Sequence, residues 1–153
     1  MTGGRPNPIG RLTPWEIPAA TDIMFAGGGA VTVVRVLVVD DQALFRRAMA
    51  SVVEETDGFV VVGQSASGEE SLEAAAVLRP DLVLMDVNLP GIDGLEATRR
   101  MRAGDAPPVV LLLSTYDEDA AEGFVAESGA AAYVTKSAFG PDELAAAWST
   151  AAL

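Results

Sequence analysis

The stretch Val33-Val34-Arg35-Val36-Leu37-Val38-Val39-Asp40-Asp41 decides the fold of this 153-residue chain. From position 33 to 39 every residue except the arginine is Val or Leu, and the run ends in two aspartates. A short β-branched run without polar alternation is typical of a strand that is covered on both faces. Such strands occur in parallel sheets with helices on each side, so the stretch predicts an α/β fold.

The chain after this first strand repeats the same arrangement. Further strands are predicted at Phe59–Gln64, Leu82–Met85, Val109–Leu113 and Ala131–Val134. Helices are predicted at about 43–55, 67–78, 93–102 and 117–129, and from Pro141 to the chain end. Strands that alternate with helices favour right-handed crossovers and a doubly wound parallel sheet. We therefore expect a five-stranded flavodoxin-like (βα)5 fold with strand order 2-1-3-4-5.

The helix boundaries rest on local signals. Ser67 and Asp93 are each followed three residues later by a glutamate, which is the pattern of a capping box. Gly129 is suited to ending the fourth helix, and Pro141 to the first turn of the fifth. In the fourth helix an acidic first turn is expected at positions 117–119.

The composition excludes several kinds of chemistry. The chain has no cysteine and no histidine, which removes disulfides, thiolate nucleophiles and imidazole bases or zinc ligands. Any active chemistry must therefore use carboxylates, hydroxyls, amines, backbone groups and a hard metal ion. The formal net charge of -12 argues against direct nucleic-acid binding by this chain.

The first 32 residues differ from the rest of the chain. They contain four scattered prolines, show no apolar period and end near a run of three glycines. We interpret 1–32 as a disordered or non-native N-terminal extension, with an ordered arm as the alternative, and 33–153 as the folded domain. The apolar stretch Ile23–Val39 is short for a membrane span and is interrupted by Arg35, so no membrane segment and a cytoplasmic location are expected.

Polar residues follow four of the five predicted strands. Asp40 and Asp41 come after the first strand, Asp86 after the third, Ser114 after the fourth and Lys136 after the fifth. The carboxyl ends of parallel strands meet at one edge of the sheet, where ligands bind in such folds. A single acid at a strand end usually does no more than end the strand, but chance explains this joint placement poorly. Lys136 is also the only lysine in the chain.

This set of side chains is suited to phosphoryl transfer. Three carboxylates without imidazole or thiolate ligands favour Mg²⁺. A carboxylate can act as a nucleophile and form an aspartyl phosphate, while a metal ion, an ammonium and a hydroxyl stabilise the transferring oxygens. Asp86, Lys136 and Ser114 supply the groups that such a reaction requires from the protein.

The sequence segments that contain the candidate site residues resemble those of response-regulator receiver domains. They are Val36-Leu37-Val38-Val39-Asp40-Asp41, Asp81-Leu82-Val83-Leu84-Met85-Asp86, Pro90-Gly91-Ile92-Asp93-Gly94 and the segment 129–136. The resemblance spans about 33–150. It implies a signalling phosphoacceptor, rather than an enzyme acting on a separate substrate, that takes its phosphoryl group from a sensor histidine kinase. Phosphorylation and dephosphorylation would be self-catalysed.

The resemblance also assigns roles to single residues. It implies that Asp86 is phosphorylated and that Asp41, Asp86 and the backbone carbonyl of Asn88 hold Mg²⁺. Asp40 would act through water or as a further metal contact. Ser114 and Lys136 would contact the phosphoryl oxygens. Tyr133 lies where the family carries a switch aromatic; an ordinary core tyrosine is the alternative.

Two segments further resemble the NarL/LuxR-type branch of these regulators. They are Leu113-Ser114-Thr115-Tyr116-Asp117-Glu118-Asp119 and Asp41-Gln42-Ala43-Leu44-Phe45-Arg46. The resemblance implies control of transcription through a carboxy-terminal helix-turn-helix domain, which these 153 residues do not include. Either the sequence was cut at a domain boundary or the protein is a single-domain regulator.

Phosphorylation is expected to move the face made by the fourth helix, fifth strand and fifth helix. A homodimer through this face, or through the first and fifth helices, is a further expectation, although Trp148 in the last helix is suited to an ordinary core position. Two alternatives remain for the function. A haloacid-dehalogenase-like phosphohydrolase would carry Asp-x-Asp after the first strand, whereas here the two aspartates are adjacent. A receiver-like interaction module that is never phosphorylated would be indicated by loss of a site residue.

Overall fold

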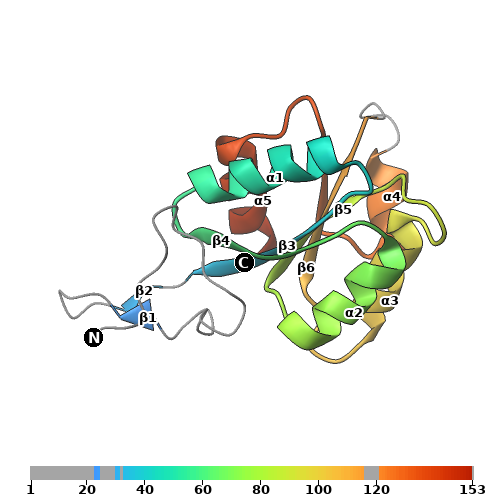
Figure 1. Ribbon diagram of the computed structural model, residues 1–153, viewed down its shortest axis with the longest axis horizontal. Coiled ribbons are helices and arrows are strands. Elements are labelled where there is room, and N and C mark those ends of the chain that lie inside the picture. The colour runs from blue at the N-terminus through green and yellow to red at the C-terminus, as the bar shows by residue number, and fades with distance from the viewer. Residues whose placement is uncertain (1–22, 25–29, 32, 116–120, 153) are drawn as a thin grey trace.

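A five-stranded sheet with helices on both sides forms the main body of the computed structural model, which describes residues 23–24, 30–31, 33–115 and 121–152 (Figure 1). The strands are β3 (Val34–Val39), β4 (Phe59–Ser65), β5 (Leu82–Asp86), β6 (Val109–Ser114) and β7 (Ala132–Thr135). All four neighbouring pairs are parallel, and the order is β4-β3-β5-β6-β7. Counted along the chain within this sheet, that is the predicted order 2-1-3-4-5.

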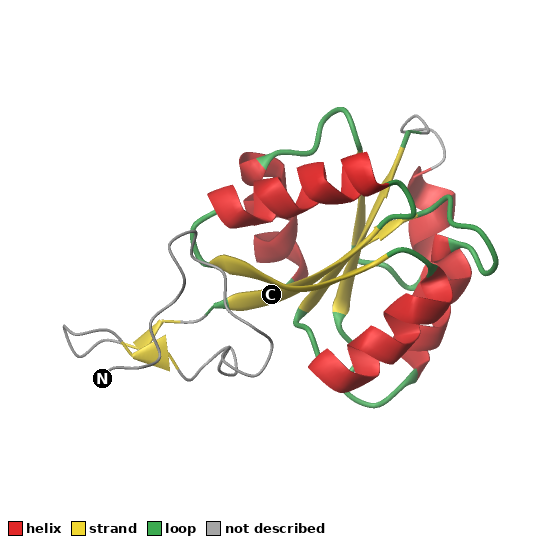
Figure 2. Cartoon of the chain, in the orientation of Figure 1, coloured by secondary structure: helices red, strands yellow, loops and turns green. Residues whose placement is uncertain are grey.

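Five helices cover the two faces of this sheet. They are α1 (Ala43–Glu55), α2 (Gly68–Leu78), α3 (Gly94–Ala103), α4 (Ala121–Ser128) and α5 (Pro141–Ala151). Helices α1 and α5 lie on one face, and α2, α3 and α4 lie on the other (Figures 1 and 2). This is the doubly wound architecture that the sequence predicts.

The uninterrupted apolar strands are explained by the two-sided core. In β3, the side chains of Val36 and Val38 pack with Met49 of α1 and Leu144 of α5. The alternate side chains, such as that of Leu37, belong to the opposite core under α2 and α3. Because successive residues of a strand point to opposite faces, both faces can be covered only if nearly every strand residue is apolar.

Capping side chains begin two of the helices as predicted. The hydroxyl of Ser67 accepts a hydrogen bond from the Glu70 N–H at 3.1 Å, and Asp93 Oδ1 accepts one from the Glu96 N–H at 2.8 Å. Glu70 reaches back to the Ala66 N–H, at 3.1 Å. These contacts satisfy backbone donors that the first turn of a helix leaves unpaired.

The predicted element boundaries hold to within two residues, except at the start of the fourth helix: α4 is described from Ala121, and the predicted start at 117 lies outside the described residues. β3 begins one residue later than expected, β4, β5 and β6 each end one residue later, and β7 is shifted by one residue. Helix α5 ends at Ala151, whereas the sequence predicts that it continues to the chain end. The expected acidic first turn at 117–119 lies outside the described residues.

Two short strands lie before the main sheet. β1 (Ile23–Met24) and β2 (Ala30–Val31) pair antiparallel and form a separate two-stranded sheet. The other residues of the 1–32 segment lie outside the described part of the chain. The interpretation of 1–32 as an extension of the domain therefore stays a prediction.

Helix α3 approaches the end of β5 closely at Gly94. The Gly94 N–H donates to the Val87 carbonyl at 2.9 Å, and a Cβ at this position would overlap the carbonyl oxygen of Asp86 and lie 2.9 Å from Val87 Cα. Any other residue here must push the helix away from the strand end. Gly94 is thus required for the backbone position of Asp86.

We predict that Gly94→Ala lowers the free energy of unfolding by about 3 kcal/mol, as expected for overpacking against fixed backbone. The matched control is Gly123→Ala in α4, where an added Cβ meets nothing within 4 Å. That control should stabilise the protein by up to about 1 kcal/mol through helix propensity. Urea denaturation of both variants measures the difference, and equal effects would contradict the close approach at Gly94.

Candidate functional site

Three aspartates meet at the carboxyl edge of the sheet, as the sequence predicts. Asp40 and Asp41 follow β3, and Asp86 is the last residue of β5. One carboxylate oxygen from each lies within 4.8 Å of the others. Asp40 and Asp86 are buried, and Asp41 is exposed. The burial of two neighbouring acids requires a compensating positive charge.

Lys136 supplies positive charge to this cluster. Its ammonium nitrogen lies 2.8 Å from Asp40 Oδ2 and 3.5 Å from Asp86 Oδ2, and its side chain is only 10% exposed. Lys136 follows β7, and its backbone N–H donates to the Ser114 carbonyl at 2.9 Å. This backbone contact fixes the start of the lysine side chain next to β6.

Residues at the start of α1 contact the second carboxylate oxygen of Asp40 and its backbone carbonyl. Asp40 Oδ1 accepts a hydrogen bond from the Gln42 N–H at 2.9 Å. The Arg46 guanidinium donates to the Asp40 backbone carbonyl at 2.7 Å. Asp40 is therefore fixed on both its carboxylate oxygens, one by a backbone amide and the other by the ion pair with Lys136.

The loop after Asp86 is fixed by contacts to its neighbours. The Asn88 N–H donates to Asp86 Oδ1 at 3.2 Å. Farther along, the Ile92 N–H donates to Glu69 Oε2 of α2 at 3.1 Å, and this hydrogen bond lowers the pKa of Glu69. Gly91 has a φ of +74°, a backbone conformation that glycine adopts without strain. These contacts hold Asn88 beside the aspartate cluster.

Ser114 is the last residue of β6 and is fully buried. In the sheet register, Leu113 pairs with Asp86 and Ser114 pairs with Thr135. Ser114 therefore lies between the strand ends that carry Asp86 and Lys136. The structure brings together all the predicted site residues that follow strands.

Tyr133 lies in β7, on the face of the sheet that α4 covers. It is half-buried against the core under α2 and α3, and its ring lies 5.9 Å from that of Phe124 in α4, at an interplanar angle of 44°. Tyr133 is three residues before Lys136 along the chain. This placement links α4 to the strand that leads into the site.

The pKa of Asp86 is raised to about 6. Burial of the carboxyl group is the main cause, and the nearby negative charge of Asp40 adds to it. Lys136 and the Asn88 N–H act in the opposite direction but do not cancel these effects. The site thus holds more negative charge than one ammonium balances, as expected of a cluster that binds a cation.

The donor set fits a magnesium ion. Asp40, Asp41 and Asp86 offer hard carboxylate oxygens, and exposed Asp41 leaves one side of the group open to solvent. Mg²⁺ prefers oxygen ligands and keeps several of its waters, which an open acidic group permits. These residues, with Asn88 beside them, could hold the ion.

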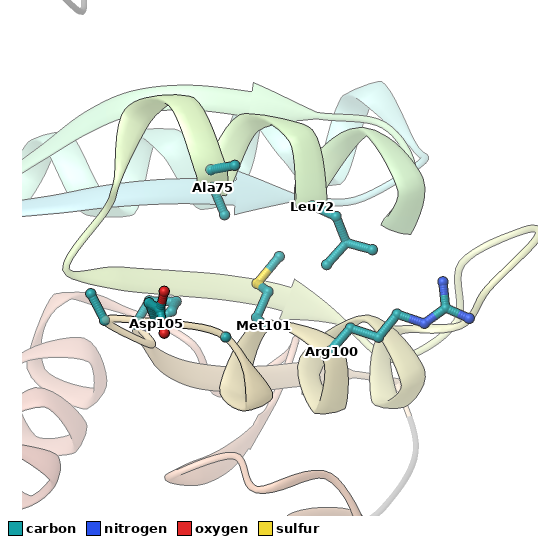
Figure 3. A pocket seen from close by; sticks show the side chains of 9 residues that line it. Leu72, Ala75, Arg100, Met101 and Asp105 are labelled. Carbon is teal, nitrogen blue, oxygen red and sulfur yellow. The ribbon is translucent and has the colours of Figure 1, made fainter.

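A separate hollow lies between α2 and the segment that joins α3 to β6, near the amino end of β6 (Figure 3). Its volume is about 240 Å³, and Leu72, Ala75, Met101 and Asp105 are among its lining residues. Gly104 and Pro108, which also line it, precede the amino end of β6, whereas the aspartates lie at the carboxyl ends. The hollow is therefore separate from the candidate site.

The contact of Phe45 with Lys136 is a feature of the site that the sequence does not predict. In the sequence, Phe45 stands out only as an apolar residue of the predicted helix 43–55, within the segment that resembles the NarL/LuxR-type branch, but its ring centroid lies 4.1 Å from the Lys136 ammonium nitrogen. Helical periodicity explains such a phenylalanine as core. Only the spatial approach of α1 to Lys136, which is 91 residues later in the sequence, reveals the contact.

Comparison with known proteins identifies the class. The response regulator receiver domain family matches residues 36–149, so the chain belongs to that family. This shows a receiver domain of a two-component response regulator. The fold and the arrangement of acids at the strand ends agree with that assignment.

Individual relatives place the chain within the family. The response regulator GacA of Pseudomonas viridiflava is 47% identical over 105 residues, which are 69% of this chain and 49% of that protein. A LuxR-family two-component response regulator from Aurantimonas sp. SI85-9A1 has a TM-score of 0.68 at 33% identity, over 75% of this chain and 81% of that one. The signal receiver domain of NarL from Mycobacterium tuberculosis has a TM-score of 0.69 at 30% identity, over 78% and 97%.

These relatives confirm the resemblance to the NarL/LuxR-type branch. The chain spans about half the length of the GacA protein that it matches. None of the helices in the described ranges has the length and apolar character that crossing a bilayer requires.

The raised pKa of Asp86 predicts how the stability of the metal-free protein depends on pH. An acid whose pKa is higher in the folded than in the unfolded state destabilises the fold when it ionises. The effect vanishes only well below the ordinary aspartate pKa of 3.8, where Asp86 is protonated in both states. It grows as pH rises to about 6 and then levels off. A shift of about two pKa units corresponds to about 3 kcal/mol.

We therefore predict that Asp86→Asn stabilises the metal-free protein by about 2–3 kcal/mol at pH 7.5 and by much less at pH 4. Urea unfolding in the presence of a chelator measures this. Asp105→Asn, at an exposed position away from the cluster, is the matched control. A stability gain for Asp86→Asn that does not change with pH would contradict the electrostatic account.

Proposed function

We propose that this receiver domain accepts a phosphoryl group on Asp86 from a sensor histidine kinase in a Mg²⁺-dependent reaction. The observation that carries the proposal is the grouping of Asp86 with Asp40, Asp41 and Lys136 at one sheet edge. The set combines a buried carboxylate, oxygen ligands for a metal ion and an ammonium. The family assignment supports the same function.

In this reaction a carboxylate oxygen of Asp86 attacks phosphorus. A new O–P bond forms, the P–N bond to the kinase imidazole breaks, and the imidazole leaves with the electron pair and is protonated by solvent. Bound Mg²⁺ would neutralise charge on the transferring oxygens. Asp40, Asp41, Asp86 and the Asn88 carbonyl are the proposed groups that hold it.

Lys136 and Ser114 are proposed to stabilise the phosphorylated state. The Lys136 ammonium already lies 3.5 Å from Asp86 Oδ2, so it is close to where the phosphoryl oxygens would arrive. The buried Ser114 hydroxyl would donate a hydrogen bond to one of those oxygens. Hydrolysis of the aspartyl phosphate by water would return the domain to its first state, without a separate phosphatase activity toward other substrates.

We further propose that Ser114 and Tyr133 pass the signal to the face formed by α4, β7 and α5. The ring contact between Phe124 and Tyr133 supports this, because movement of either side chain alters the packing of α4 on β7. A phosphoryl group adds about -1.5 to -2 charge units, enough to shift a balance between two packings. The output would be transcription, through a helix-turn-helix domain outside this chain, with a homodimer through this face or through α1 and α5. A cytoplasmic location fits this role.

The first test is intact mass after incubation with acetyl phosphate and Mg²⁺. We expect the protein to gain one phosphoryl group, and we expect no gain for Asp86→Asn or when Mg²⁺ is chelated. Asp105→Asn, which removes an exposed acid at the other edge of the sheet, should gain the group normally. A wild-type protein that forms no adduct, and that does not respond to beryllofluoride with Mg²⁺, would instead favour the unphosphorylated interaction module.

A second test addresses the route of the signal. We expect phosphorylation to change amide hydrogen exchange in α4 and β7, because local opening reports altered packing. Exchange in α2, on the same face but outside the proposed route, serves as the internal control. Unchanged exchange in α4 and β7 of a fully phosphorylated sample would contradict the proposed route.

A further inference from the structure

The Lys136 ammonium has a third neighbour besides the two aspartates. Its nitrogen lies over the ring of Phe45, 4.1 Å from the centroid, while Asp40 and Asp86 are at 2.8 and 3.5 Å. A cation within about 6 Å of a ring centroid is attracted by the negative face of the ring. The attraction is strong here because the lysine side chain is only 10% exposed.

The ring differs from the aspartates in one important respect. Asp40 and Asp86 are also the groups that would contact Mg²⁺ and phosphoryl oxygens, so their interaction with Lys136 must change during the reaction. The ring of Phe45 takes no part in metal binding and carries no net charge. It therefore offers Lys136 a contact that persists when the carboxylates turn to other partners.

The lysine needs such a contact because its stem is flexible. A four-carbon side chain has many rotamers, and its ammonium is a point charge without the geometric preference of a guanidinium. Helix α1 fixes the ring by placing Phe45 half-buried in its first turn. The strand end fixes the other end of the side chain, through the hydrogen bond from the Lys136 N–H to the Ser114 carbonyl.

We propose that Phe45 is a positioning residue, whose ring face holds the Lys136 ammonium in place for phosphoryl transfer to Asp86. This inference rests on the proposed function of Asp86. The first turn of α1 would then contribute to the reaction by holding the Lys136 ammonium, in addition to packing against the sheet. A rotation of α1 would then alter the reactivity of the site through the position of one ammonium.

Phe139 serves as a matched control, because it lines the same small cavity as Phe45. A small cavity of about 50 Å³ is lined by Phe45, Met49, Leu113, Lys136 and Phe139, among others. Phe139→Leu removes the same volume as Phe45→Leu beside the same cavity, whereas the ring under the ammonium is that of Phe45. A purely structural role for Phe45 predicts that the two variants behave alike.

The contact itself can be measured without phosphorylation. Lys136 is the only lysine of the chain, so ¹³C-lysine labelling of untagged protein gives one set of side-chain signals. Protons above a ring face are shifted upfield, and we expect this for the ε-methylene of Lys136. The shift should disappear in Phe45→Leu, persist in Phe45→Tyr and persist in Phe139→Leu. An unshifted wild-type signal would overturn the inference.

The role in the reaction is measured by the rate of phosphorylation with acetyl phosphate and Mg²⁺. We expect Phe45→Leu to lower it roughly tenfold, from the strength of a desolvated cation–π contact. Phe45→Tyr and Phe139→Leu should keep it within about twofold. Site-specific replacement of Phe45 by 4-fluoro-, 3,5-difluoro- and pentafluorophenylalanine should lower the rate stepwise, because fluorine withdraws electron density from the negative face of the ring and changes the side-chain volume little.

The outcomes separate this inference from the proposed function. If wild-type protein is phosphorylated and the fluorinated series shows no trend, the positioning role of Phe45 fails while the function of Asp86 stands. If wild-type protein forms no adduct under any condition, the proposed function fails, and the positioning role fails with it. A stepwise loss of rate that parallels loss of the ring-current shift supports both.

Discussion

One ammonium group shared among buried carboxylates is the interaction on which the rest of this structure depends. Asp40 and Asp86 are both buried at the carboxyl edge of the sheet, and Lys136 lies between them. Two such acids would repel each other strongly without a cation, and burial raises the cost further. The compensation is incomplete, since the pKa of Asp86 stays raised to about 6. The site is thus poised to gain a further cation.

The surrounding fold serves to hold this cluster. The parallel sheet brings residues from β3, β5 and β7 to one edge, and the close approach of α3 at Gly94 fixes the backbone of Asp86. The start of α1 supplies a backbone donor for Asp40 and a ring for Lys136. Each of these elements contributes to packing or to helix capping. Together they leave the Lys136 ammonium within reach of both Asp40 and Asp86, so that it can change partners. That combination is what a switch driven by a single covalent modification requires.

Much of the fold and site could be predicted from sequence because both depend on regular rules. Apolar runs that end in acids specify parallel strands, and the carboxyl ends of such strands meet, so the meeting of Asp40, Asp86 and Lys136 follows from topology. Contacts between side chains that are distant in sequence do not follow in this way. The approach of Phe45 to Lys136 depends on the angle at which α1 crosses the sheet, and hydrophobic periodicity carries no information about that angle. The contact of Glu69 with the loop after Asp86 is of the same kind.

The most direct test of the central claim is a crystal structure of the domain with Mg²⁺ and beryllofluoride. We predict a beryllofluoride group on Asp86 and a metal ion held by Asp41, Asp86 and the Asn88 carbonyl, with Asp40 in contact with the ion directly or through water. We also predict that the Lys136 ammonium moves from Asp40 to a fluorine atom while it remains over the ring of Phe45. A structure in which Asp86 is unmodified at saturating beryllofluoride, with Lys136 still paired to Asp40, would contradict that claim.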